Sequence, residues 1–192
     1  MTRTATSTRA SALPTDQRRT MIVAATLPLL IEHGDRVTTK QVAEAAGIAE
    51  GTIFRVFANK DELIAAAVDT ALDRAPLEAA LAAIPQDAPF LDALIVAIGM
   101  IQQRVLDVWR LMSGIGTRFH DLAQHPMVDS EALVRLFEVH RDRLTVEPVV
   151  AARLLRALTL ASTHPMLIGE AMPPDTLAHL FLHGLGREDR PC

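Results

Sequence analysis

The sequence predicts an all-α protein, and three observations lead to that prediction. Apolar residues recur at helical spacing through most of the chain. Residues typical of helix starts and stops separate these runs, and no segment shows strand alternation flanked by turn residues. The 192 residues are 49% hydrophobic, which is enough to build a core in one compact unit or in a small domain joined to a larger one.

The composition argues against several classes of protein. The stretches without charge are too short to span a bilayer, and the N-terminus lacks the apolar segment of a secretory signal. Cys192 is the single cysteine, which excludes an internal disulfide and a cysteine-rich zinc site. We therefore expect a soluble cytoplasmic protein with no membrane contact, no cofactor and no metal.

Charge is unevenly distributed along the chain. The net charge is −4, yet residues 1–60 contain more basic than acidic side chains, and both lysines, Lys40 and Lys60, lie there. A basic first third on an acidic body suggests that only the N-terminal part faces a polyanion.

The first third contains a predicted arm and four predicted helices. Residues 1–13 show no apolar period and are expected to form a disordered arm. The first helix begins near Pro14 and ends at Gly34, and Pro28 inside it is expected to kink it or to remove a hydrogen bond. The other three are expected from the capping box Thr38–Gln41 to Gly47, from about Glu50 to Val56, and from the Asn59 cap through Leu72.

Further helices are predicted in the rest of the chain. Pro76 is expected to break the preceding helix, and residues 77–84 to form one or two turns. The segment 90–110 is so apolar that it should be buried nearly all round. Later helices are predicted at residues 119–123, 130–144, 148–163 and 175–184.

Two short helices joined by a tight turn at residues 47–49 are the layout of a helix-turn-helix, whose second helix enters the major groove of DNA. Gly51 carries no side chain, so the backbone there can approach a phosphate closely. Thr52 and Arg55 are expected to point outward, and Lys60 opens the next helix, where amides and an ammonium together suit a phosphate. We therefore assign residues 14–60 to a DNA-binding domain and residues 61–192 to a second helical domain.

The segment TTKQVAEAAGIAEGTIFRVFANKDELI resembles the DNA-binding domain of the TetR family of bacterial transcriptional repressors, over roughly residues 18–72. The resemblance implies an all-helical homodimer that binds pseudo-palindromic operator DNA. It also implies release of that DNA when a small-molecule effector enters the C-terminal domain. The C-terminal 120 residues agree with the family in length and helicity but show no motif match.

Carried over to this sequence, the resemblance implies phosphate contacts at Thr39 and Lys60 and base or backbone contacts at several nearby positions. The predicted DNA-binding residues are Thr39, Lys40, Glu50, Gly51, Thr52, Phe54, Arg55 and Lys60. Two interpretations of Glu50 stay open: it accepts a hydrogen bond from a cytosine amino group, or it repels phosphate.

Three positions depart from the family pattern. Phe54 replaces the usual tyrosine, Val56 the usual histidine, and Ala49 the frequent capping serine. Together these departures predict weaker anchoring to the DNA backbone. Arg55, or Arg3 and Arg9 of the arm in the minor groove, would compensate for this weaker anchoring. For Arg3 and Arg9, plain disorder of the arm is the simpler interpretation.

The second domain offers large apolar side chains with a few polar points among them. They form a candidate effector pocket, or they simply fill the core. The candidate residues are Met100, Trp109, Met112, Phe119, His120, Phe137 and His140. Such a pocket would favour a hydrophobic or aromatic effector, and an anionic one if Arg104, Arg110 or Arg118 turned inward.

The last two long helices are the candidates for dimerisation. Residues 148–163 alternate small residues with leucines, and Leu177, Leu180, Phe181 and Leu185 form a stripe on the final helix. His179 and His183 have the spacing of a metal pair, but no third ligand accompanies them, so we predict no metal site.

The alternative hypothesis is that the protein is an enzyme, and the sequence gives this hypothesis little support. Gly114-Ile115-Gly116 lacks the strand and the third glycine of a dinucleotide loop, and no orienting carboxylate accompanies Ser113 and His120. We therefore predict a regulator and not an enzyme. The alternative within that class is a DNA-binding regulator without a ligand, whose C-terminal body only dimerises or docks a protein partner.

Overall fold

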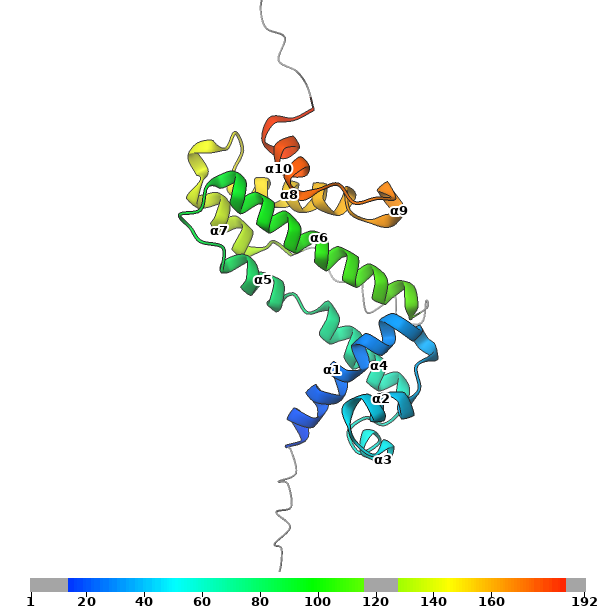
Figure 1. Cartoon of the computed structure of the whole chain (residues 1–192). Coiled ribbons are helices and arrows are strands. Elements are labelled where there is room, and N and C mark those ends of the chain that lie inside the picture. Colours follow the sequence, from blue (N-terminus) through cyan, green and yellow to red (C-terminus); the bar gives the residue numbers. More distant parts are fainter. Residues whose placement is uncertain (1–13, 116–127, 186–192) are drawn as a thin grey trace, which may run out of the picture. The chain divides into compact units, whose positions relative to one another are not determined.

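The computed structural model describes residues 14–115 and 128–185, and every regular element in these two ranges is a helix (Figure 1). The chain divides into two compact units, Met1–Thr70 and Ala71–Cys192. The predicted all-α class is confirmed. The predicted arm at residues 1–13 and the predicted helix at residues 119–123 lie outside the described residues. Within the described ranges, no helix has the length and apolar character needed to cross a bilayer.

The first unit begins with α1, Thr15–His33, which continues through Pro28 as a single helix. Proline has no N–H, so the bond that residue 28 would donate to the carbonyl of Ala24 cannot form. The helix ends at Gly34, whose positive φ of 61° is unfavourable for residues with a side chain. A 3₁₀ turn, η1, follows at Gly34–Arg36.

The three helices that follow start close to the predicted positions. They are α2, Thr39–Ala46, α3, Glu50–Ile53, and α4, Lys60–Leu72. The predicted capping box is present: the Thr38 hydroxyl accepts from the Gln41 N–H, and the Gln41 side chain accepts from the Thr38 N–H at 2.8 Å. Asn59 caps α4 by accepting from the Glu62 N–H at 2.8 Å.

The second unit consists of six helices within the described residues. They are α5, Ala75–Ala82; α6, Phe90–Gly114; α7, Glu131–Val139; α8, Pro148–Ala161; α9, Pro165–Ile168; and α10, Pro174–His183. Its core consists of apolar residues of α5, α6, α7, α8 and α10. Phe137 of α7 lies at the centre, edge-on to Phe90 and tilted against Phe181, with 5.9 Å between ring centroids in both pairs.

Two predicted boundaries in the second unit were wrong, and one short helix was missed. Pro76 does not end a helix but lies in the first turn of α5, where a missing N–H leaves no bond unmade. The predicted helix at 130–144 is shorter, because α7 ends at Val139 and a 3₁₀ turn, η3, follows at Arg141–Arg143. The short helix α9 was not predicted.

His140, just after α7, stacks on Phe90 with 4.5 Å between ring centroids. Burial is the main reason why its pKa lies below the usual value; Arg143 lowers it further, and Asp142 opposes the change. As the pH falls, the imidazole of the unfolded chain is protonated before that of the folded protein. The stability contributed by the neutral ring is therefore complete above the unfolded pKa of about 6.5, and it is lost as the pH falls through the folded pKa.

His140→Phe is therefore expected to reduce the fall in unfolding free energy between pH 7.5 and 5.5, as measured by urea titration. An unchanged pH dependence in this variant would contradict the role given to His140.

Candidate DNA-binding site and ligand cavity

The predicted helix-turn-helix is formed by α2, a tight turn and α3. Gly47 ends α2 in the left-handed conformation (φ 66°, ψ 32°), and the N–H of Ile48 returns to the carbonyl of Ala43 at 3.0 Å. Val42, Ala43, Ile53 and Phe57 are buried and form the shared apolar side of these elements. This packing leaves the opposite side of α3 open to solvent.

The second helix is shorter than its predicted span of residues 50–56. After Ile53 the chain continues through tight turns, in which Arg55 N–H donates to Thr52 O at 3.2 Å and Val56 N–H to Ile53 O at 2.9 Å. Ala49 at the start of α3 provides no side-chain cap, as the sequence predicts. The recognition element is therefore one α-helical turn followed by a compact turn that ends at the buried Phe57.

The predicted DNA-binding residues all lie at least partly at the surface of this segment. Thr39, Thr52 and Lys60 are half-buried, and the others are exposed. Phe54 has 52% of its surface exposed, which is unusual for a phenylalanine and leaves its ring available to a partner. Within the described residues, Arg55 makes no ion pair, so its guanidinium has no competing carboxylate.

The two residues that are predicted to contact phosphate, Thr39 and Lys60, form hydrogen bonds within the first unit. The Thr39 hydroxyl donates to a Glu50 carboxylate oxygen at 2.5 Å, and Lys60 Nζ donates to the carbonyl of Asp35 at 2.5 Å. Glu50 thereby connects the start of α2 to the start of α3, and Lys60 connects α4 to η1. Neither contact has a local signal in the sequence, because the partners are 11 and 25 residues apart.

Arg19 of α1 is a structural residue of this domain that the sequence analysis missed. Its guanidinium lies over the Phe57 ring at 4.4 Å from the centroid, and it reaches the Val56 carbonyl and a Glu62 oxygen, both at 3.5 Å. A cation over an aromatic face is attractive. Arg19 therefore holds the end of the recognition segment against α1.

Gly51 gives a direct test of close approach to DNA. A Cβ built at this position meets no atom within 4 Å, so nothing in the protein requires glycine there. Gly51→Ala is expected to fold normally but to bind DNA about tenfold more weakly, the size of one lost hydrogen bond to a charged group. Fluorescence anisotropy with a bound genomic fragment measures the affinity.

Gly47→Ala is the matched control. Its φ of 66° is unfavourable for alanine, so this variant is expected to lose about 1 kcal/mol of stability while the folded fraction binds DNA normally. Equal DNA affinity of Gly51→Ala and wild type would contradict close backbone approach at Gly51.

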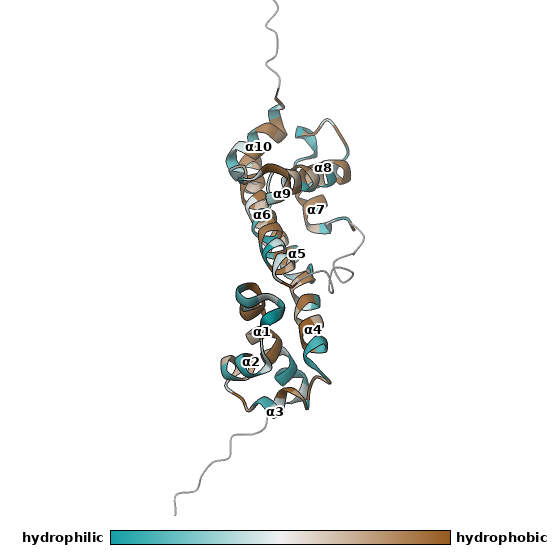
Figure 2. Cartoon of the chain, turned by 90° about the vertical axis from the view of Figure 1, so that its right-hand side faces the viewer, coloured by the Kyte–Doolittle hydropathy of each residue, from teal (hydrophilic) through white to brown (hydrophobic). Residues whose placement is uncertain are grey.

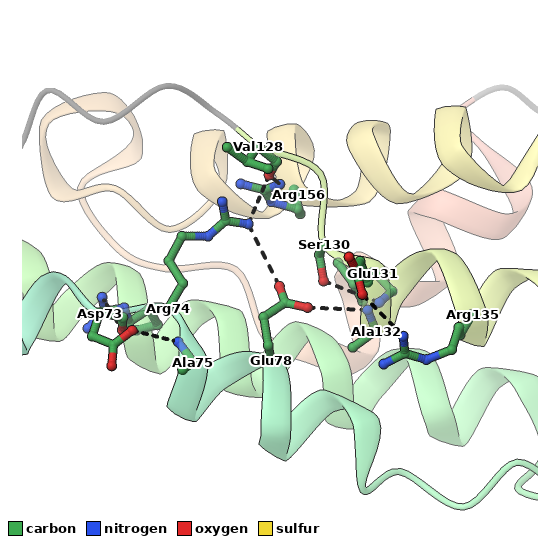
Figure 3. Close-up of polar contacts among 12 residues, drawn as sticks. Asp73, Arg74, Ala75, Glu78, Val128, Ser130, Glu131, Ala132, Arg135 and Arg156 are labelled. Carbon is green, nitrogen blue, oxygen red and sulfur yellow. Dashed lines mark hydrogen bonds and ion pairs between the residues drawn. The ribbon is translucent and has the colours of Figure 1, made fainter.

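The second unit contains a cavity of about 200 Å³ that is lined by residues of α5, α6, α7 and α8 and by Arg74 and Ser130. Its apolar wall is formed by Leu77, Leu81, Ile101, Val105, Leu133 and Leu160. Its charged side chains are Arg74, Glu78, Arg104 and Arg156. Figure 3 shows part of this charged side, with Arg74, Glu78 and Arg156 directed toward one another beside Val128.

The predicted effector residues are not brought together in this cavity. Phe137 and His140 lie around Phe90, Met100 packs against the core, Trp109 lies edge-on to His164, and Met112 is half-buried. Phe119 and His120 lie outside the described residues. The assignment of these residues to an effector pocket stays a prediction.

The three arginines considered for an anionic effector have different surroundings. Arg104 lines the cavity and donates to the carbonyls of Ala71 and Asp73. Arg110 is exposed and pairs with Asp107 at 3.1 Å. Arg118 lies outside the described residues.

Comparisons with known proteins relate the first unit to a family. Residues 22–67 match the family described as bacterial regulatory proteins, tetR family. The match lies within the first unit, so it is this unit that is similar to the TetR family. A 54-residue alignment is 46% identical to the HTH-type transcriptional regulator YvkB of Bacillus subtilis (strain 168), and it covers 28% of this chain and only 27% of that protein.

Solved TetR structures share the fold of the whole described chain. A TetR-family regulator from Mesorhizobium loti aligns with a TM-score of 0.63 at 15% identity, over 89% of this chain and 98% of that one. The TetR-like regulator LfrR from Mycobacterium smegmatis, solved in complex with proflavine, aligns with a TM-score of 0.55 at 22% identity, over 89% and 98% of the two chains. The matched family and YvkB are both described as regulatory proteins, which is the class that the sequence predicts.

Proposed function

We propose that this protein is a TetR-family transcriptional repressor that binds operator DNA through α2, α3 and the start of α4. The observation that carries the proposal is the division of side chains in one short segment. Gly51, Phe54 and Arg55 are exposed, whereas Ile53 and Phe57 between and after them are buried. A helix-turn-helix uses such an exposed side to read base edges while neighbouring amides and cations hold phosphates.

Four of the candidate residues have distinct tasks in this proposal. Arg55, without an ion-pair partner in the described residues, is assigned to base contact, and Gly51 to close backbone approach. Lys60 uses one of three N–H donors on Asp35 O, which leaves two for a phosphate. Glu50 positions Thr39 and keeps its second oxygen for a cytosine amino group.

The proposed assembly is a homodimer that acts in the cytoplasm, where its operator DNA lies. Val150, Leu154 and Leu158 of α8 are exposed large apolar residues at a spacing of four, and Ala157 and Ala161 are exposed as well. The ribbon of α8 carries hydrophobic colour in Figure 2. Such an apolar stripe on a surface helix favours an interface. In α10, Leu177 and Phe181 pack into the core of the unit. The part of α10 that would join the dimer interface is therefore the face that carries His179 and His183.

The proposed regulation is release of DNA by a small-molecule effector bound in the second unit. The cavity described above supports this proposal, and so does the similarity to LfrR, which was solved with proflavine. An effector acts only through different affinities for two conformations. Because α4 begins at Lys60 and runs as one helix to Leu72, a shift of its C-terminal end would be carried to the phosphate contact.

DNA binding tests the proposal directly. Lys60→Ala is expected to weaken binding to all sequences and to reduce the slope of log affinity against log salt by about one per subunit. Arg55→Ala is expected instead to change sequence preference and to lose about 1–3 kcal/mol at its base pair. The measurement is binding to the upstream intergenic DNA and to a randomised library, at two salt concentrations.

Arg36→Ala is the control, because it removes an exposed cation from the same unit at a position outside the predicted contacts. Its salt slope and sequence preference should match those of the wild type. No salt-sensitive binding of the wild type to any genomic fragment would contradict the proposed function and favour a protein-docking regulator.

A further inference from the structure

The turn that directly follows α3 holds the ring of Phe54 at the surface. Phe54 is 52% exposed, whereas Ile53 before it and Phe57 after it are at most 1% exposed. Hydrogen bonds from the N–H groups of Val56 and Phe57 to the carbonyl of Ile53, both at 2.9 Å, fix the backbone of this turn. Because Ile53 and Phe57 fill the core below the turn, the Phe54 ring stays outside it.

The Phe54 ring does not belong to an apolar patch. In the first unit as far as the structure describes it, the other exposed large apolar residue is Ile31 of α1. The exposed residues close to Phe54 in the chain are small or charged, namely Glu50, Gly51 and Arg55. An interface with another protein usually has a continuous apolar centre. A lone ring among polar groups is better matched to one small apolar target.

Phe54 lies on the same side of α3 as Glu50 and Gly51. Its backbone keeps right-handed helical dihedral angles (φ −71°, ψ −6°), so residues three and four positions earlier are its neighbours on the helix surface. The Glu50 carboxylate is held there by the Thr39 hydroxyl at 2.5 Å. A carboxylate next to the ring repels a phosphate that would touch both groups. The ring is therefore better placed against base edges than against the DNA backbone.

The chemistry of a phenyl ring limits what it can recognise in the major groove. The ring has no N–H or O–H group, so it cannot read the pattern of hydrogen-bond donors and acceptors on the bases. The apolar group that base pairs present in this groove is the C5-methyl group of thymine. Approach of DNA to the backbone at Gly51 brings the ring within reach of it, since a Cβ built there meets no protein atom within 4 Å.

We propose that Phe54 reads one thymine in each half-site of the operator through the C5-methyl group of that base. The proposal deepens the proposed function and rests on DNA binding by α3. It adds a T·A base pair to the one that Arg55 is assigned to read. Burial of one methyl-sized group corresponds to about fourfold in affinity, hence about sixteenfold for the two half-sites of a dimer.

Replacement of single thymines by deoxyuridine tests the proposal. The wild type first selects a bound fragment from a randomised library, and each thymine is then replaced in both half-sites at once. Uracil keeps the hydrogen-bonding groups of thymine and lacks only the methyl group. Fluorescence anisotropy is expected to show one position at which the replacement weakens wild-type binding about sixteenfold.

Three variants assign this effect to the ring. Phe54→Ala is expected to lose less than about twofold at the same position, because the methyl group then has no apolar partner to lose. Phe54→Tyr keeps the ring and should keep the wild-type ratio of affinities for thymine and uracil. Arg36→Ala, the exposed cation outside the predicted contacts, should match the wild type at every position.

A comparison of cytosine with 5-methylcytosine at the same position separates the methyl group from the rest of the base. Cytosine presents an amino group where thymine presents a carbonyl oxygen, and its 5-methyl group occupies the place of the thymine methyl. The wild type is expected to prefer 5-methylcytosine over cytosine by about fourfold per half-site. Phe54→Ala is expected to bind both fragments equally.

The proposal is overturned if no thymine replacement weakens wild-type binding by more than about twofold. An equal loss in the wild type and in Phe54→Ala also overturns it, because another residue then meets the methyl group. So does a Phe54→Ala variant that binds thymine and uracil fragments with equally reduced affinity and keeps the wild-type ratio, since the ring then contacts a sugar.

Failure of the proposed function is a different result. If the wild type binds DNA in a salt-sensitive way without any effect of the thymine methyl groups, DNA binding stands and only the role of Phe54 fails. If the wild type binds no DNA fragment, the proposed function fails, the role of Phe54 fails with it, and a protein-docking regulator is favoured.

Discussion

Replacing Leu154 and Leu158 together by glutamate is expected to convert the proposed dimer into monomers and to lower operator affinity by about 10²–10⁴-fold. The two leucines are 53% and 38% exposed on one side of α8. In a two-fold interface each residue occurs twice, so the double variant places four carboxylates at an apolar seam. The two DNA-binding domains of a dimer bind two half-sites together, and this bivalent binding raises the affinity by a factor of that order. Separate monomers lose this gain in affinity. Light scattering measures the mass, and anisotropy measures the affinity.

Val139→Glu is the control for this variant. Val139 is an exposed apolar residue with 46% of its surface accessible, but it belongs to α7 and is not part of the α8 stripe. It should leave both mass and affinity unchanged. A double variant that keeps the mass of a dimer would contradict the assignment of α8 to the interface.

Phe57→Ala is expected to destabilise the first unit by about 3–5 kcal/mol, the usual range for deletion of a buried phenyl ring. Phe57 is 1% exposed, ends the recognition segment, and lies beneath the guanidinium of Arg19. Its removal leaves a cavity and also deprives Arg19 of its aromatic contact. Urea unfolding measures the loss, and DNA binding should fail at temperatures where the wild type is folded.

Phe54→Ala provides the matched comparison three residues earlier. The Phe54 ring is 52% exposed, so its deletion should change stability by less than about 0.5 kcal/mol. Any loss of DNA affinity in this variant then reflects a surface contact. Equal destabilisation by the two variants would contradict the buried role of Phe57.

The helix-turn-helix was largely predictable, because its signals are local in the chain. The capping box joins Thr38 and Gln41, and the αL turn at Gly47 directly follows α2. Hydrogen bonds between residues three or four apart leave a readable pattern in a sequence. The family resemblance extended the same pattern to the residues that are predicted to contact DNA.

Errors arose where one residue type serves two local structures. Pro76 was expected to break a helix and instead lies at the start of α5, since proline suits a first turn as well as a break. The predicted helix at 130–144 was extended to Leu144, seven residues after Phe137, but residues 140–143 are all polar and the chain turns as a 3₁₀ helix at Arg141–Arg143. Propensity alone cannot distinguish these cases.

The sequence by itself determined the fold class and the position of the helix-turn-helix, and it indicated the family that this segment is similar to. Only the tertiary structure decided which side chains meet: Arg19 with Phe57, Thr39 with Glu50, and the arginines of α6 and α8 around one cavity. Large apolar residues such as Phe137 were pocket candidates by size, yet Phe137 fills the core. The reason is physical: a cap or turn is made by neighbours in the chain, whereas a cavity wall is made by helices that packing alone brings together.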